Sequence, residues 1–244
     1  MNNDDMNTTA RLGGYAAIGG TVTMLIGTAL LIASGADLDT ALATGDIAGF
    51  LTAAGETRQF LIANLTIWIM GVFILGIAGT AMALLSKRQV VAQIAMYCYW
   101  TAVPLVIAAY MAWLAIVVQV APDNSATAVL LTEKTGWFAS RADWVATILI
   151  LSFGPALIAQ AGRGDWVPTW LVRWSYVSLF TGFLTAVALL AGGNGPSTYG
   201  MLILPVGMGW MVIAGVVMLR RSKVTQDSEN RVTPSHLSGE KVLS

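Results

Sequence analysis

The stretch AGETRQFLIANLTIWIMG, residues 54–71, opens with charged and polar side chains and then becomes almost wholly apolar. From Gln59 to Ser86 the chain carries no charged residue. Roughly 18 or more such residues are enough for a helix to cross a hydrocarbon core of about 30 Å. The stretch therefore predicts a membrane-spanning helix whose polar start lies at the membrane surface.

Five further apolar runs flank this helix, in a chain of 244 residues that is 56% hydrophobic and only 11% charged. Such a composition is typical of a membrane protein rather than a soluble domain. We predict an all-α fold, a polytopic membrane helix bundle with six transmembrane helices, over residues 12–219. The predicted spans lie near 12–34, 60–85, 90–120, 143–161, 168–192 and 200–219.

The lysines and arginines near the span ends are divided unequally between the two sides. One side has Arg11, Lys87, Arg88, Arg163, Arg173, Arg220, Arg221 and Lys223, and the other has Arg58, Lys134 and Arg141. Because positive charge favours the cytoplasmic side, we predict a multi-pass inner (plasma) membrane protein with both termini in the cytoplasm. Residues 1–11 would be a short cytoplasmic tail, and the polar residues 220–244 a disordered one. The small residues of IASGA, 32–36, leave signal-peptide cleavage as an alternative.

Two outer connections, residues 37–55 and 122–136, are longer than simple turns. Each begins with helix-capping residues, so we predict a short interfacial helix in each, the first with Leu38, Leu42, Phe50 and Leu51 as its apolar residues. Several tryptophans, Trp144 among them, lie toward the predicted span ends. We interpret them as belts at headgroup level rather than as an aromatic ligand cage.

Small residues predict how the spans pack, because close approach of helices replaces the hydrophobic effect inside lipid. Two sets recur every seven residues, almost two helical turns: Gly13, Gly20, Gly27 and Ser34 in the first span, and Thr57, Asn64, Gly71 and Ala78 in the second. We predict that Asn64 makes an interhelical hydrogen bond worth about 1 kcal/mol. Ser178, Thr181 and Thr185 share one face of the fifth span, where they bond their own helix, pair with a neighbour or line a polar cavity.

Several chemistries are absent from the sequence. His236 is the only histidine and no phosphate-binding glycine loop occurs, which argues against histidine-ligated metals, histidine-based nucleophilic catalysis and nucleotide cofactors. We expect no metal, no cofactor and no nucleic-acid partner, and we consider an enzyme the least favoured class. Within the predicted spans no charged residue falls near the middle, which disfavours a proton-driven pump.

The candidate site is therefore the outer rim formed by the starts of spans two and four. Glu56, Arg58, Arg141 and Asp143 are predicted to meet there as a salt-bridged cluster, unless they are independent solvated flanks. In the functional reading an arginine holds an anionic group, Gln59 and Asn64 supply hydrogen bonds, and Trp144 forms an apolar wall. Ser178, Thr181 and Thr185 would line the cavity beneath.

A short tail ending in Arg11, a glycine-bearing first span, an acidic outer loop and the entry GETRQFLIANL give a weak, pattern-level resemblance to a bacterial family of six-span inner-membrane proteins of unknown function. The likeness covers residues up to about 120 and implies the architecture alone. Two functional hypotheses follow from the residues. The first is a non-enzymatic protein that acts through the lipid bilayer, a membrane-protein partner or its own oligomer. The second is binding or transport of a small apolar or weakly polar molecule, of unknown identity, through the outer mouth.

Overall fold

The computed structural model describes residues 3–191 and 200–232, with side chains for 4–191 and 201–222. It confirms the all-α class over these residues. In chain order the helices are α1 (Asn3–Ser34), α2 (Leu38–Thr44), α3 (Ile47–Glu56), α4 (Arg58–Leu84), α5 (Gln89–Ala115), α6 (Ala126–Ile148), α7 (Gly154–Ala161), α8 (Thr169–Leu190) and α9 (Ile203–Val232). Two π-helical segments, η1 (Ile116–Val120) and η2 (Leu149–Phe153), follow α5 and α6, and a 3-10 turn, η3 (Gly200–Leu202), precedes α9.

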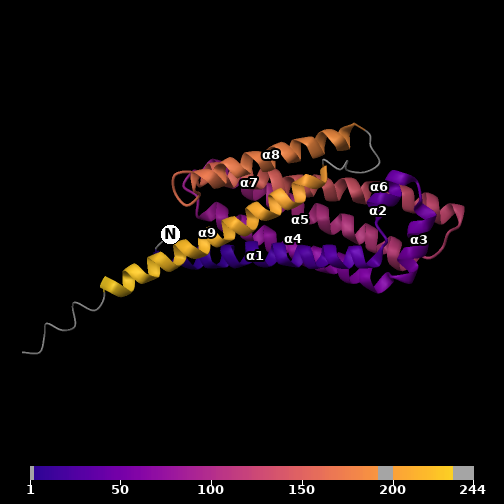
Figure 1. The fold of residues 1–244 in the computed structure, drawn as a ribbon, viewed down its shortest axis with the longest axis horizontal. Coiled ribbons are helices and arrows are strands. Elements are labelled where there is room, and N and C mark those ends of the chain that lie inside the picture. The colour runs from indigo at the N-terminus through magenta and orange to yellow at the C-terminus, as the bar shows by residue number, and fades with distance from the viewer. Residues whose placement is uncertain (1–2, 192–199, 233–244) are drawn as a thin grey trace, which may run out of the picture.

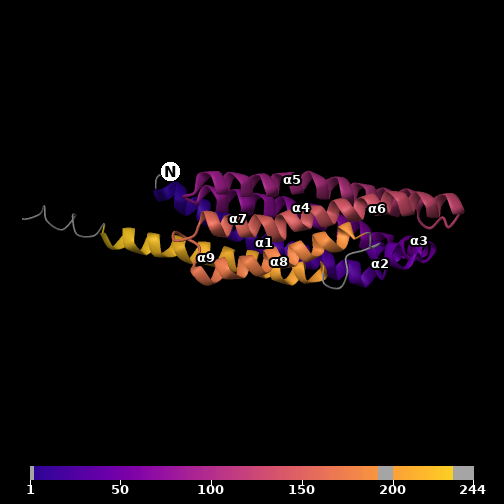
Figure 2. The same cartoon turned by 90° about the horizontal axis from the view of Figure 1, so that it is seen from above.

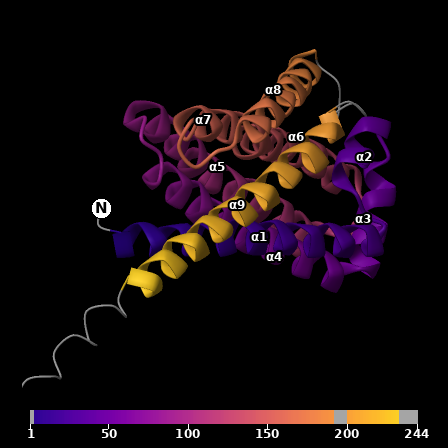
Figure 3. The same cartoon turned by 60° about the vertical axis from the view of Figure 1, so that its left-hand side comes forward.

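Within residues 3–191 and 200–232, six helical stretches are long and apolar enough to cross a membrane, as the sequence predicts. They are Asp4–Ser34, Arg58–Leu84, Gln89–Val120, Ala126–Ala161, Thr169–Leu190 and Ile203–Ser222. All six run along the long axis of the bundle, although α9 crosses α1 obliquely (Figures 1 and 3). Helices α2 and α3 cover one end, which we call the α2–α3 end, whereas α1 begins and α9 ends at the other, which we call the terminal end (Figures 1 and 2).

Helices α1 and α4 pack along their whole length through the two predicted small-residue sets, which meet in antiparallel pairs. Thr57 Oγ1 donates to the Ser34 carbonyl at 3.1 Å. Seven residues further along α4, Asn64 Nδ2 donates to the Gly27 carbonyl at 2.8 Å, so the predicted interhelical bond is confirmed. A Cβ on Gly71 would lie 2.8 Å from Met24 Sδ, and a Cβ on Gly20 would lie 3.2 Å from the Leu75 backbone nitrogen. Glycine is required at these positions because the backbones approach so closely.

The fourth span differs from its prediction, since it forms one continuous helix with the second outer connection. The helix runs from Ala126 through α6, η2 and α7 to Ala161, instead of a short helix near 122–136 followed by a span from 143. Gly136 does not end a helix. It lies inside α6, where a Cβ would be 3.0 Å from Leu38 Cδ1, so its missing side chain makes room for α2. The π-helical turn η2 directly precedes Gly154 and Pro155, and a proline without an N–H is a common cause of such an irregularity in a helix.

The first outer connection also differs, because it forms two helices rather than one. Asp37 caps α2, Gly45 ends it in the left-handed region at φ 80°, and Asp46 caps α3. The four apolar residues expected to face the membrane surface are all buried in the protein core: Leu38, Leu42, Phe50 and Leu51. Helices α2 and α3 are therefore lids packed on the bundle.

The polar tail is the third difference. Helix α9 continues to Val232, so residues 220–232 are helical although the sequence predicts disorder from residue 220. Residues 233–244 lie outside the described residues.

Candidate functional site

The predicted cluster of four charged residues is not formed. Glu56 is exposed at the end of α3 and Gln59 at the start of α4, whereas Arg58 donates from Nη2 to the Ala121 carbonyl at 2.5 Å, beyond the end of η1. The Arg141 guanidinium lies 5.1 Å from the centroid of the Trp137 ring. Among the described residues no ion pair joins Arg58 to Glu56 or to Asp143.

The polar residues predicted to line a cavity are instead packed between helices. Asn64 is fully buried against Gly27, and Ser178, Thr181 and Thr185 are buried in α8. Thr181 and Thr185 bond carbonyls one turn back in their own helix at 2.9 Å. Ser178 donates to the Leu151 carbonyl, whose usual helical partner would be the N–H that Pro155 lacks. The Ser178 hydroxyl therefore joins α8 to the π-helical turn η2.

A cavity of about 130 Å³ lies elsewhere, between α1, α4, α5, α6 and α9, close to the α2–α3 end. Its lining comes from Met24, Thr28, Leu31, Asp37, Asp39, Trp68, Tyr110, Trp113, Asp143, Trp144, Thr147, Met201, Leu204 and Met208. Of the predicted site residues only Asp143 and Trp144 belong to it. We call it the Asp39–Asp143 cavity.

Aromatic rings form much of its wall. The Trp68 ring centroid lies 5.3 Å from that of Tyr110 and 6.4 Å from that of Trp113, and the Tyr110 and Trp113 centroids are 6.5 Å apart. Trp68 is fixed because its Nε1 donates to the Met24 carbonyl at 3.0 Å. Trp144 Nε1 donates to Asp39 Oδ2 at 2.9 Å, which fixes a fourth ring and a carboxylate together.

Two carboxyl groups share this cavity with the rings. Asp143 makes a hydrogen bond with the Tyr110 hydroxyl and lies near enough to Asp39 for the two to repel each other when ionised. Burial raises the pKa of Asp39 above its ordinary value, and the Ser140 hydroxyl, the Trp144 N–H and Arg141 only partly oppose this. Asp39 Oδ1 is buried without a well-aligned hydrogen-bond partner among the described residues.

The depth of Asp143 corrects the expectation that no charged residue lies near the middle of a span. Seventeen residues precede Asp143 in the 36-residue helix Ala126–Ala161 (143 − 126 = 17). Its cavity neighbours Met24, Trp68 and Tyr110 each lie ten residues from the α2–α3 end of their helices, at Ser34, Arg58 and Val120. At a rise of about 1.5 Å per residue, the carboxyl is roughly 15 Å inside the bundle.

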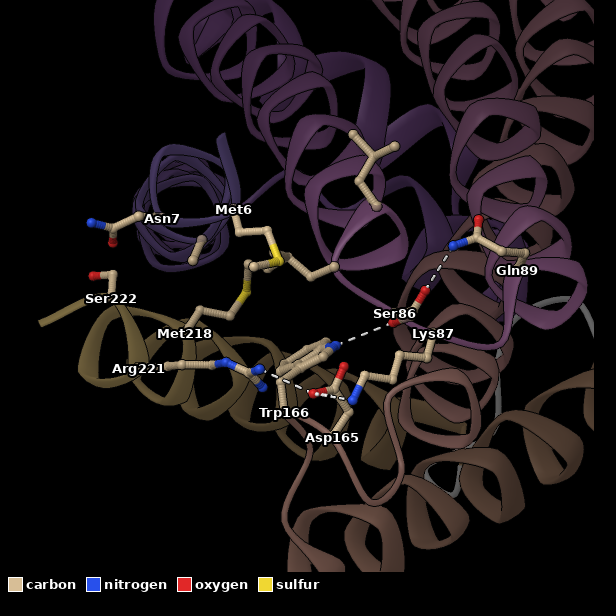
Figure 4. A pocket seen from close by; sticks show the side chains of 13 residues that line it. Met6, Asn7, Ser86, Lys87, Gln89, Asp165, Trp166, Met218, Arg221 and Ser222 are labelled. Atoms are coloured by element: carbon tan, nitrogen blue, oxygen red, sulfur yellow. Dashed lines mark hydrogen bonds and ion pairs between the residues drawn. The ribbon is translucent and has the colours of Figure 1, made fainter. Parts of the chain in front are cut away.

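A second cavity, of about 410 Å³, lies at the terminal end and is wider (Figure 4). Asp165 accepts from Arg221 at 3.0 Å and pairs with Lys87 at 3.5 Å, and Trp166 Nε1 donates to Ser86 Oγ at 3.1 Å (Figure 4). These contacts join the α4–α5 turn, the α7–α8 turn and α9. They connect these three segments at the terminal end, and the Asp165 carboxylate balances part of the positive charge of Lys87 and Arg221.

The six apolar helices and the charged groups placed inside them define an integral membrane protein of the helical-bundle class. No family model, curated protein sequence or solved structure matches the chain. The physical character of the Asp39–Asp143 cavity is therefore the basis for its function.

Proposed function

We propose that this integral membrane protein binds a small organic cation, an amine or a quaternary ammonium, in the Asp39–Asp143 cavity. The observation that carries the proposal is the combination of two carboxyl groups with the aromatic rings of Trp68, Tyr110, Trp113 and Trp144 around one small cavity. Aromatic rings attract a cation through their negative faces, by about 2 kcal/mol or more when water is excluded. Carboxylates supply the countercharge without requiring donors from the ligand.

The size of the cavity limits the ligand. A volume of about 130 Å³ is close to that of the roughly 150 Å³ engineered cavity that takes up one benzene molecule. A tetramethylammonium-sized group fits this space, with any longer substituent directed toward Asp37 and Met201. The ligand is thus more polar than the weakly polar molecule expected from the sequence, and it is cationic rather than anionic.

The proposal predicts discrimination by charge between ligands of one shape. Choline and tetramethylammonium are expected to raise the thermal unfolding midpoint of the detergent-solubilised protein, because a ligand that binds only the folded state stabilises it. The uncharged choline isostere 3,3-dimethylbutan-1-ol should bind at least about tenfold more weakly, since it lacks the cation–π and carboxylate attraction. Equal midpoint shifts from the two compounds would contradict a cation site.

A role limited to contacts with lipid or a protein partner is the second proposal. It is supported by exposed apolar side chains such as Tyr176, Phe180 and Phe183 on α8. Side chains of this kind are also expected on any helix that faces acyl chains, so they do not favour a partner over lipid. The charged cavity has no use in that role, and we therefore rank cation binding first.

We also propose that the α2–α3 end faces outward and both termini face the cytoplasm, on the basis of the eight-to-three distribution of lysine and arginine. In a Cys98→Ala background, Ala43→Cys and Arg88→Cys place single thiols at exposed positions of opposite ends. A membrane-impermeant maleimide added to intact cells or spheroplasts should label Ala43→Cys, and Arg88→Cys only after lysis. The reverse pattern would invert the topology.

A further inference from the structure

The Asp39–Asp143 cavity has two acids in a lining that otherwise consists mostly of aromatic and apolar side chains. Titratable and charged groups facing the pair come from three elements: Asp37 and Asp39 at the start of α2, Tyr110 from α5, and Arg141 and Asp143 from α6. The lining residues from α1, α4, η3 and α9 carry no titratable side chain: Met24, Thr28, Leu31, Trp68, Met201, Leu204 and Met208. The titratable groups around the cavity are thus mainly acidic, and Arg141 is the one cation among those named here.

Two ionised carboxylates that line one small cavity repel each other, and a pair of this kind commonly holds one proton between its members. Arg141 attracts Asp39 and only partly opposes the effect of its burial. Tyr110 and Trp144 bond one member each, which satisfies individual oxygens and leaves the pair's net charge unchanged. Burial also raises the pKa of Asp39 above its ordinary value, which is the direction that favours a proton shared by the pair.

We infer that the cavity exchanges one proton for one organic cation. This inference rests on the proposed cation binding and adds its coupling. In the empty state one carboxyl O–H and one carboxylate carry a net charge of −1. When a monovalent cation enters, the O–H bond breaks, the proton leaves to water on the α2–α3 side, and two carboxylates with one cation again carry −1. The net charge of the buried site is the same in both states, which avoids the large cost of an uncompensated buried charge.

The exchange of a proton for a cation determines the direction in which pH changes the affinity for the cation. Because the proton and the cation compete for the same carboxylates, acid should weaken cation binding. The apparent Kd should fall about tenfold per pH unit wherever the empty pair still holds its proton, and become independent of pH above that range.

The experiment has a readout that needs no ligand. Infrared spectra of the ligand-free protein at about pH 7 are expected to contain the carbonyl band of a protonated carboxyl. The band should be lost in the double variant Asp39→Asn/Asp143→Asn and kept in Glu56→Gln, which alters an exposed carboxylate. Adding tetramethylammonium should remove the band in the unaltered protein and release about one proton per cation into weak buffer.

Each outcome is decisive. A ligand-free spectrum without the band, or cation binding that releases no proton, overturns the exchange while leaving cation binding intact. Failure of tetramethylammonium and choline to bind anywhere from about pH 5 to 9 overturns the proposed function and the exchange together. A band that persists in the double variant assigns the proton to another group and likewise overturns the inference.

Discussion

Replacing Gly27 by leucine is expected to lower the free energy of unfolding by about 3–5 kcal/mol, from overpacking and a buried amide left without its partner. A Cβ at Gly27 would overlap the Trp68 ring, lying 2.5 Å from Nε1. The Gly27 carbonyl also accepts the Asn64 bond, and Trp68 in turn donates to Met24. A side chain there therefore separates α1 from α4 and displaces a ring of the cavity.

Gly19→Leu is the matched control, because it lies in the same helix and a Cβ there would meet nothing within 4 Å. Thermal and denaturant unfolding in one detergent should show near-native stability for Gly19→Leu and severe destabilisation for Gly27→Leu. If both variants unfold at the same midpoint, the α1–α4 packing described above is wrong.

Asp143→Asn is expected to weaken binding of tetramethylammonium roughly 100-fold, corresponding to about 3 kcal/mol for the loss of one buried charge partner. Asparagine has the same shape and can still accept from the Tyr110 hydroxyl, so the ring positions are preserved. Removing a buried acid should also leave the ligand-free protein as stable as before, or more so. Loss of affinity combined with unchanged stability distinguishes a ligand contact from a structural one.

Calorimetric titration of the purified variants measures this effect, with Glu56→Gln as the carboxylate control. Glu56 is exposed and lies outside the cavity, so its affinity should match that of the unaltered protein. A tenfold or smaller loss in Asp143→Asn, or an equal loss in both variants, would show that the Asp143 charge does not hold the cation.

The bundle and much of its α1–α4 contact are predictable because they depend on local chain properties. Long uncharged runs identify the spans. The seven-residue repeats that contain Gly27 in α1 and Asn64 in α4 predict which sides of the two helices meet. The continuous fourth helix is missed because Glu133, Lys134 and Arg141 interrupt its hydropathy. The contact of α2 with Gly136 shows that this charged first part of the helix packs against the protein instead of forming a loop.

The site is less predictable, since it is assembled from six segments of the chain: α1, α2, α4, α5, α6 and η3–α9. When the fourth span is delimited by its apolar run alone, Asp143 falls at the polar start of that span. Its depth emerges only from neighbours such as Trp68 and Tyr110. One signal in the sequence was available: Trp68 and Trp113 fall well inside their spans rather than at the headgroup level where belt tryptophans lie.

The contact between Leu38 and Gly136 gives the cavity a remote determinant. Leu38 is fully buried and stands between Asp37 and Asp39, so whatever sets the position of its side chain also sets the position of both acids. Residue 136 contacts no ligand, yet a methyl group there would press on Leu38 and move α2 by tenths of an ångström. Substitutions at positions 136 and 39 are therefore energetically non-additive, as expected of sites that share a partner. Engineering of the proposed cation site can therefore use position 136, which does not line the cavity, to change affinity while every lining residue stays the same.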